Sequence, residues 1–197
     1  MRILGLTGGM GAGKTYVATL FRAAGWPVFD ADACVHRLQS RGGAAIAPIA
    51  RLWPGVVVDG AVDRAKLRAA VIHDPKAMRT LEGLIHPLVR REREHFVRRA
   101  RARGHRWCVF EIPLLFETGA ERECDRVLVV AAPETLRIRR VMRRRSVDLG
   151  QARALLARQM AEHERRRRAD FVLHTGLSRA ETFRQFIRIK TALESLP

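Results

Sequence analysis

A glycine-rich segment near the start of the chain has the residue types needed to bind a chain of phosphates. Residues 8–15 read GGMGAGKT and match the pattern G-x-x-x-x-G-K-[ST] at every required position. In this pattern, glycines let successive backbone NH groups turn toward an anion, a lysine reaches the β- and γ-phosphates, and a hydroxyl binds Mg²⁺. The expected phosphate contacts are Gly9, Gly11, Ala12, Gly13, Lys14, Thr15 and Tyr16. Thr15 is also the expected Mg²⁺ ligand.

The same segment does not fit the dinucleotide pattern G-x-G-x-x-G. Read from Gly9, the pattern meets Lys14 where its last glycine should stand, and read from Gly11 it meets Tyr16. A nucleoside triphosphate is therefore the expected ligand. Three uses stay open at this point: hydrolysis that drives motion, a GTP switch, and phosphoryl transfer to a small acceptor.

Two carboxylates stand where transfer to an acceptor would need them. Asp30 ends a predicted strand at residues 27–30, and Asp32 follows two positions later. Because the carboxyl ends of parallel strands face the ligand crevice, we expect both side chains beside the phosphate loop. Asp32 is the candidate base for an attacking hydroxyl, and Asp30 supports it. The alternative is structural: Asp32 caps the next helix and Asp30 only ends the strand.

Later segments add a carboxylate and a group of arginines. Glu111 stands near the end of a predicted strand, where it could join Asp32 in holding the Mg²⁺ shell through water or could pair with a nearby arginine. The arginines share a predicted helix, and one of them could neutralise charge on the transferring phosphoryl group. They are Arg139, Arg140, Arg143, Arg144 and Arg145. The alternative is a solvated helix face. Spacing alone does not show which of these arginines would reach the phosphoryl group.

Short apolar runs alternate with helical patterns and predict an α/β fold with a five-stranded parallel sheet flanked by helices. The expected strands are 2–7, 27–30, 107–112, 126–132 and 171–174. The expected helices include 14–24, 31–39, 133–145, 148–163 and 178–196. Between the second and third strands, a helical stretch is expected, with no strand apart from the apolar run 56–58, which is too short to assign. Its helix at 75–102 is predicted to break at His86 and Pro87.

The charge of the 197-residue chain is +17, and it is local. Residues 90–106 carry a net +6 and residues 137–168 a net +9, so two segments supply 15 of the 17 charges. Basic segments suit a polyanionic ligand, with nucleic acid as the rival. Aromatic residues are only 6% of the chain and no nucleic-acid module is recognisable, so no nucleic-acid partner is expected.

Apolar runs are too short for a membrane protein. The longest, Val127–Ala132, is far below the roughly 20 residues that cross a bilayer, and the first residues lack the apolar region of a signal peptide. A cytoplasmic protein without a membrane partner is therefore expected, as a monomer or weak homo-oligomer.

Several further motifs, in order and spacing along nearly the whole chain, resemble the dephospho-coenzyme A kinase family. They are the phosphate loop, D-A-D at 30–32, L-I-H-P at 84–87, P-L-L-F-E at 113–117, P-E-T at 133–135, Gln159 and A-D at 169–170. The resemblance implies transfer of the γ-phosphoryl group of ATP to the 3′-hydroxyl of the ribose in dephospho-coenzyme A, with Mg²⁺. The alternatives are another small-acceptor P-loop kinase of the nucleoside monophosphate kinase type and a nucleic-acid-binding P-loop ATPase.

The resemblance also implies a P-loop kinase fold with three parts. A nucleotide-binding core takes residues 1–35, 105–135 and 169–197, a helical substrate domain takes 36–104, and a helical lid takes 136–168.

Residue by residue, the family pattern implies Asp32 as base with Lys14 on the phosphates. The implied substrate-side positions are Thr7, Asp30, His86 and Leu114. The family's two lid arginines, four residues apart, fall on Arg140 and Arg144 or on Arg139 and Arg143, and Arg144 is the chosen candidate, with Arg143 behind it. The chain departs from the pattern at Tyr16, at Leu136–Arg137 and in the short turn 174–176.

Overall fold

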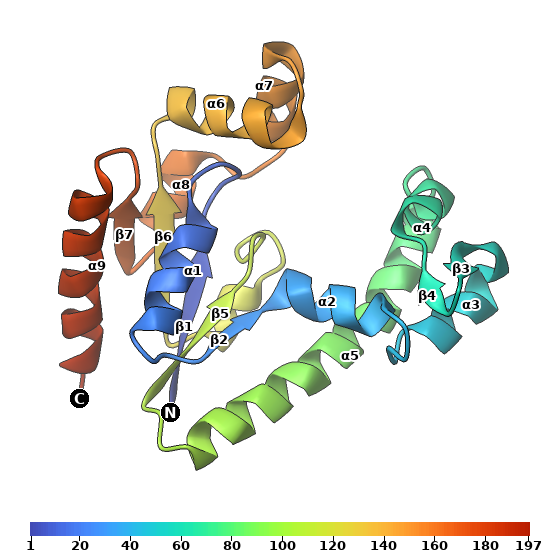
Figure 1. Cartoon of the computed structure of the whole chain (residues 1–197), viewed down its shortest axis with the longest axis horizontal. Coiled ribbons are helices and arrows are strands. Elements are labelled where there is room, and N and C mark those ends of the chain that lie inside the picture. The colour runs from blue at the N-terminus through green and yellow to red at the C-terminus, as the bar shows by residue number, and fades with distance from the viewer. The chain divides into compact units, whose positions relative to one another are not determined.

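The computed structural model describes residues 1–197 and contains a five-stranded sheet with the order β2-β5-β1-β6-β7. The strands are β1 (Arg2–Thr7), β2 (Val28–Asp30), β5 (Trp107–Glu111), β6 (Arg126–Ala131) and β7 (Phe171–His174). The pairs β1/β5, β1/β6 and β6/β7 run parallel. Figure 1 shows the sheet with helices around it, which confirms the predicted fold class.

The strands are buried on both faces because nearly every residue in them is apolar. Alternate residues of β6 enter different clusters: Leu128 and Val130 join the main core, and Val127 and Val129 join a second one. Helices α1 (Lys14–Ala23) and α9 (Arg179–Glu194) cover the main core. There Phe21 and Phe186 meet edge to face with ring centroids 4.9 Å apart.

The chain divides into two compact units, one of residues 1–28 with 104–197 and the other of residues 29–103. The first unit holds four of the five strands of the sheet whole, and the division falls within β2. Its remaining helices are the 3-10 helix η2 (Ala120–Glu123), α6 (Glu134–Arg145), α7 (Leu149–Ala157) and α8 (Glu162–Arg167). The implied substrate domain and lid stay predictions, since this division does not test what they do.

The second unit is mainly helical but contains a small hairpin. Its elements are α2 (Ala31–Gln39), α3 (Ile46–Leu52), the 3-10 helix η1 (Pro54–Val56), β3 (Val57–Val58), β4 (Ala61–Val62), α4 (Arg64–Val71) and α5 (Pro75–Ala102). Strand β3 lies in the apolar run 56–58 that was left open, whereas β4 contradicts the expectation of no other strand in this stretch. Asp59 and Gly60 both have positive φ, 50° and 75°, in the two-residue turn between β3 and β4. Asp-Gly between apolar residues is a strong hairpin signal, which the sequence analysis passed over.

Helix α5 runs unbroken from Pro75 to Ala102, so the predicted interruption at His86 and Pro87 is also wrong. Pro87 lacks the NH that would bond to the carbonyl of Gly83 one turn earlier. Helix α5 packs against α2 and α4, and this tertiary packing offsets the missing hydrogen bond. Despite its 28 residues, neither α5 nor any other helix is long and apolar enough to cross a membrane.

The predicted helix at 148–163 is two helices, α7 and α8, separated by residues 158–161. Asp148 caps α7 and forms a capping box with Gln151. The break has a structural reason, because side-chain and main-chain groups in it bond to the rest of the unit. Gln159 accepts from the amide of Met10, and the amide of Met160 donates to Glu117.

We expect Pro87→Ala to raise the free energy of unfolding by about 1–3 kcal/mol, because alanine restores the missing helical hydrogen bond. Pro75→Ala is the matched control, since Pro75 occupies the first turn of the same helix, where no NH partner exists. Urea denaturation of both variants measures the difference. A Pro87→Ala protein no more stable than Pro75→Ala would contradict the prediction.

Candidate functional site

The phosphate loop joins β1 to α1 and leaves the start of that helix open. Gly11 and Gly13 have φ of 76° and 93°, a backbone region that favours glycine, and Gly13 caps α1 without a side-chain bond. The amides of Gly11, Gly13, Lys14 and Thr15 donate to no acceptor in the protein. An open helix N-terminus with several unused amides is an anion site.

Not every amide of the loop is available. The amide of Ala12 donates to the carbonyl of Gly9, and that of Tyr16 donates to the carbonyl of Gly13. The contacts predicted for these two residues therefore stay predictions. The Tyr16 side chain itself is largely exposed on the first turn of α1.

Side chains from α6 and from the segment after α7 bind the outer edge of the loop at Met10. Arg137, in the first turn of α6, donates from Nε to the Met10 carbonyl oxygen at 3.1 Å. Gln159 accepts from the Met10 amide at 2.8 Å. Both main-chain groups of Met10 are thus bound from outside the loop.

A second pair of side chains binds the next two carbonyl groups. Arg140 donates to the Gly11 carbonyl at 3.0 Å and to both oxygens of Thr175, also at 3.0 Å. The Thr175 hydroxyl donates to the Ala12 carbonyl, and Thr175 is buried directly after β7. Three consecutive carbonyl oxygens therefore have partners on the outside. This arrangement leaves the later amides of the loop for a ligand.

Lys14 lies beside a buried carboxylate. Its Nζ is 3.8 Å from Oε1 of Glu111, and Nη2 of Arg22 donates to the other oxygen at 3.4 Å. Glu111 is only 5% exposed at the end of β5. The arginine pairing weighed from the sequence is present, and the same carboxylate also faces the lysine of the phosphate loop.

The donor set near the loop suits Mg²⁺. Thr15 presents an exposed hydroxyl on the first turn of α1, and Glu111 supplies carboxylate oxygens. Nowhere do three or more His, Cys, Asp or Glu side chains gather into a metal site. Mg²⁺ bound with nucleotide usually takes one or two protein oxygens together with phosphates and waters, which fits this sparse set.

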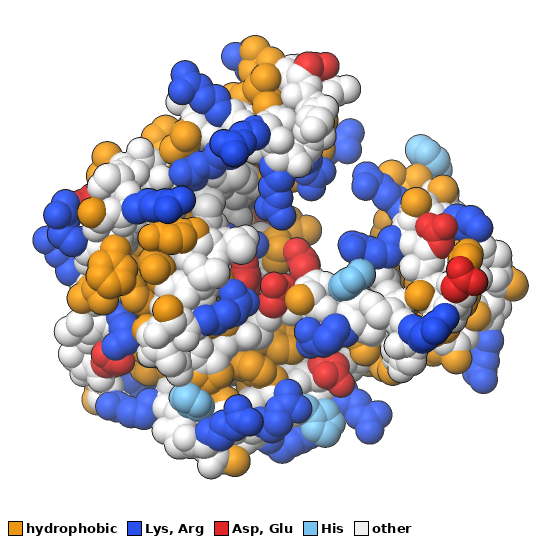
Figure 2. All heavy atoms as spheres, in the orientation of Figure 1, with side chains coloured by type: hydrophobic (Ala, Val, Ile, Leu, Met, Phe, Trp, Pro, Cys, Tyr) orange, Lys and Arg blue, Asp and Glu red, His pale blue; other side chains and the backbone are white.

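Of the basic residues of α6, Arg144 shares the face that meets the phosphate loop. It is four residues after Arg140 and seven after Arg137, so the three side chains lie along one stripe. Arg139 and Arg143 are exposed on other faces of the helix. Figure 2 shows basic side chains gathered over α6.

In the second unit, Asp30 and not Asp32 is the cap of α2. Oδ1 of Asp30 accepts from the amide of Ala33 at 2.9 Å. Asp32 lies in the first turn of α2, is exposed, and makes no hydrogen bond or ion pair. The structural alternative weighed for Asp32, a helix cap, is therefore wrong.

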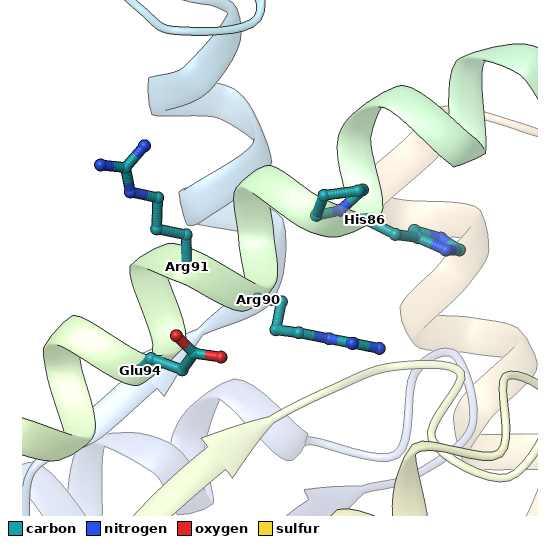
Figure 3. A pocket seen from close by; sticks show the side chains of 5 residues that line it. His86, Arg90, Arg91 and Glu94 are labelled. Carbon is teal, nitrogen blue, oxygen red and sulfur yellow. The ribbon is translucent and has the colours of Figure 1, made fainter.

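A hollow of about 260 Å³ lies along α5. It is lined by His86, Pro87, Arg90, Arg91 and Glu94. Figure 3 shows His86 and Arg90 extending to the same side of the helix, while Arg91 points away from them. His86 and Arg90 together offer a cationic side chain and an imidazole to one ligand.

Comparison with known proteins identifies the family. The sequence model of the family described as dephospho-CoA kinase matches residues 2–180. A dephospho-CoA kinase of Gluconobacter oxydans is 54% identical over 189 residues, which is 94% of this chain and 94% of that protein. The chain belongs to the dephospho-CoA kinase family. Membership makes it a kinase, and kinases of this family use ATP.

Two solved structures share the fold of this chain. A crystal structure from Thermus thermophilus is 37% identical, with a TM-score of 0.86, and the match covers 100% of this chain and 98% of that one. A dephospho-CoA kinase from Campylobacter jejuni has a TM-score of 0.73 at 22% identity, over 97% and 96% of the two chains. The second likeness shows the shared fold alone.

Two further positions implied by the dephospho-CoA kinase pattern lie after strands of the first unit. Thr7 is buried at the end of β1, and its hydroxyl donates to the Pro113 carbonyl at 3.1 Å. Leu114 follows that proline and is 44% exposed. The structure brings Thr7 and the segment containing Leu114 together.

Sequence reasoning missed the residues that support the loop from outside. Arg137 and Thr175 entered it only as departures from the dephospho-CoA kinase pattern, and Arg140 only as a possible lid arginine. One signal was available: Thr175 directly follows β7, and Arg137 lies in the first turn of the helix that follows β6. Side chains just past the ends of parallel strands are the ones that can reach a loop past β1.

We expect Thr175→Val to lower the free energy of unfolding by about 1–3 kcal/mol, because a buried carbonyl of Ala12 loses its donor. Thr175→Ser keeps the hydroxyl and is the control. Chemical denaturation followed by circular dichroism measures both. Equal stability of the valine and serine variants would show that the hydroxyl does not hold the loop.

Proposed function

We propose that the chain transfers the γ-phosphoryl group of ATP to the 3′-hydroxyl of the ribose of dephospho-coenzyme A, giving coenzyme A and ADP. The observation that carries this proposal is the ring of unused amides at the start of α1, in a chain 54% identical to a dephospho-CoA kinase over nearly its whole length. The reaction is the last step of coenzyme A biosynthesis.

The phosphate loop is the proposed donor site. The unused amides of Gly11, Gly13, Lys14 and Thr15 bind the β- and γ-phosphate oxygens, and Gly9 and Gly13 supply the shape that the loop needs. The ammonium of Lys14 moves from Glu111 to the β- and γ-phosphates when the nucleotide binds. Mg²⁺, when bound, neutralises phosphate charge, and its proposed ligands are the Thr15 hydroxyl and, through water, Glu111 or Asp32.

Asp32 is the proposed general base. Its carboxylate takes the proton of the 3′-hydroxyl as that oxygen forms a bond to the γ-phosphorus, while the bond from phosphorus to the β–γ bridging oxygen breaks and ADP leaves. The support for this role is that Asp32 is exposed and unpaired, and that Asp30 already caps α2. Asp30 is proposed to contact the substrate.

Residues 36–104 are the proposed substrate domain. In its hollow on α5, the imidazole of His86 and the guanidinium of Arg90 lie on the same side of the helix. Dephospho-coenzyme A carries a diphosphate, which a guanidinium binds through two parallel hydrogen bonds. Thr7 and Leu114 are the proposed substrate contacts from the first unit.

Residues 136–168 are the proposed lid, with Arg144 as its catalytic arginine. Arg140 is held by Gly11 and Thr175, whereas Arg144 continues the same face without a protein partner. A guanidinium in this position neutralises charge on the transferring phosphoryl group. Arg143 is the second candidate.

The protein is proposed to work in the cytoplasm, as a monomer or weak homo-oligomer, without a nucleic-acid or membrane partner. A nucleoside monophosphate kinase activity and a nucleic-acid-dependent ATPase activity are the competing functions. A panel of acceptors with ATP and Mg²⁺, including nucleoside monophosphates and single-stranded DNA, separates them from phosphorylation of dephospho-coenzyme A.

We expect Lys14→Ala and Asp32→Asn to lower kcat for dephospho-coenzyme A by about 10²–10⁴-fold, because the first loses phosphate binding and the second loses the base. Asp63→Asn is the control, since Asp63 caps α4 and asparagine also caps helices. A coupled assay for ADP measures all three. Normal turnover of a folded Asp32→Asn protein would remove Asp32 as the base.

We expect Arg144→Gln to lower kcat by about a hundredfold with a small change in the KM of dephospho-coenzyme A, because the lost charge acts on the transition state. Arg143→Gln, on another face of α6, should stay within about twofold of the parent protein. The same coupled assay compares the two. A larger loss in Arg143→Gln would reverse the assignment within the lid.

A further inference from the structure

Two arginines of the first unit are buried next to the phosphate loop. Arg137 is 5% exposed and Arg165 is 1% exposed, and Arg165 is the largest fully buried side chain of the protein. Arginine is rarely buried unless its charge has partners, because removing a guanidinium from water is costly. Arg137 belongs to α6 and Arg165 to α8, and both side chains reach Gly9 of the phosphate loop. Figure 1 shows α6 and α8 near the loop that joins β1 to α1. Their placement therefore needs an explanation.

The two guanidinium groups share their carboxylates. Nη1 of Arg137 donates to Oε2 of Glu162 at 3.2 Å, and Nη2 of Arg165 is 3.7 Å from the same oxygen. Nη1 of Arg165 is 3.8 Å from Oε1 of Glu117. Nε and Nη1 of Arg165 have no hydrogen-bond partner, and burial lowers the pKa of this guanidinium. The hydrogen bonds of Arg165 therefore do not explain why this side chain is buried here.

Both guanidinium groups lie beside Gly9 of the phosphate loop. A Cβ at Gly9 would lie 2.4 Å from Nη2 of Arg137 and 2.9 Å from Nη2 of Arg165, both too close. Gly9 does not have the positive φ of Gly11 and Gly13, so its backbone would accept alanine. Alanine at Gly9 would therefore force these guanidinium groups to shift away from Met10 and Glu162, where they are now held.

Arg137 also fixes the next residue of the loop. Its Nε donates to the Met10 carbonyl at 3.1 Å while its Nη1 reaches Glu162 in α8. One planar group thus bonds to the loop at one edge and to α8 at another, and it packs on Gly9. Lysine has no such fork, so charge alone does not reproduce the contact.

We propose that Arg137, backed by Arg165, is a positioning residue for phosphoryl transfer, which sets the shape of the phosphate loop by filling the space beside Gly9 and holding the Met10 carbonyl. This proposal rests on the proposed function only in that the loop binds ATP. Arg137 acts through the loop and does not touch the reacting atoms. A small displacement of the phosphate loop would slow phosphoryl transfer, since a misplacement of about 1 Å can lower a reaction rate about a hundredfold.

The test is a double-mutant cycle that measures ADP affinity by calorimetry. Gly9→Ala alone should weaken ADP binding by at least about tenfold, because the new methyl group meets Arg137. In an Arg137→Ala background, the loss of ADP affinity caused by Gly9→Ala should be at least about threefold smaller, because the Arg137 guanidinium no longer occupies the space beside residue 9. No relief in that background would overturn the proposal.

Gly11→Ala is the matched control for the cycle. A Cβ there would meet the main chain of Arg137, 2.6 Å from its carbonyl oxygen, and the positive φ adds strain. Removing the Arg137 side chain should therefore give no relief at Gly11. Equal relief at both glycines would mean that Arg137→Ala merely loosens the loop, and it would overturn the proposal.

Steady-state kinetics supply a readout that a general loss of stability would not move. Arg137→Lys and Arg137→Met should both raise the KM of ATP by about tenfold or more, with the KM of dephospho-coenzyme A within about twofold. Arg153→Met, at an exposed position in α7 that has no proposed role, should match the parent. A lysine variant with the parent's KM for ATP would show that charge suffices, contrary to the proposal.

Folding and the proposed function are controlled separately. If Arg137→Ala does not fold by circular dichroism, Arg137→Met replaces it in the cycle, since methionine keeps buried apolar bulk without reaching Gly9 with a guanidinium. ADP binding does not require the acceptor. A chain that binds ADP and shows the coupling but leaves dephospho-coenzyme A unmodified would refute the proposed substrate and keep the role of Arg137.

Discussion

The first unit depends on one constraint, that a short loop must point its amides at an anion while its carbonyl groups find partners elsewhere. Unpaired main-chain groups are costly inside a protein, so a loop with open amides needs bonds on its other side. Here the carbonyl oxygens of Met10, Gly11 and Ala12 accept from Arg137, Arg140 and Thr175. The amides of the helix start are left for phosphate because these carbonyls are satisfied from outside.

The parallel sheet is what brings those partners to the loop. Strand β1 lies between β5 and β6, and β6 lies beside β7, so the chain leaves all four strands at the same edge. Glu111 ends β5, α6 begins three residues after β6, and Thr175 follows β7 directly. Side chains separated by more than a hundred residues thereby contact one six-residue loop. The register of the sheet is therefore part of the site.

This dependence explains how much the sequence could predict. The phosphate loop, the strands and Asp30–Asp32 are local patterns, and each was found from neighbouring residues alone. The hairpin at Asp59–Gly60 was equally local, and a recognisable turn signal was overlooked. Pro87 within α5 and the break after α7 are different, because packing on α2 and α4 and the Gln159 contact override local preference. The outer bonds of the loop are set by the sheet, which no short pattern encodes.

Several of the arginines that make the chain basic form contacts within the protein. The net +9 of residues 137–168 suggested a surface for an anionic ligand, yet Arg137, Arg140 and Arg165 use their guanidinium groups on the protein itself. Arginine suits that task because its rigid fork can bond to a carbonyl and a carboxylate at once, which the single ammonium of lysine cannot do with the same geometry. Part of the charge of this segment therefore builds the frame of the phosphate loop, and only exposed members such as Arg144 remain for a ligand.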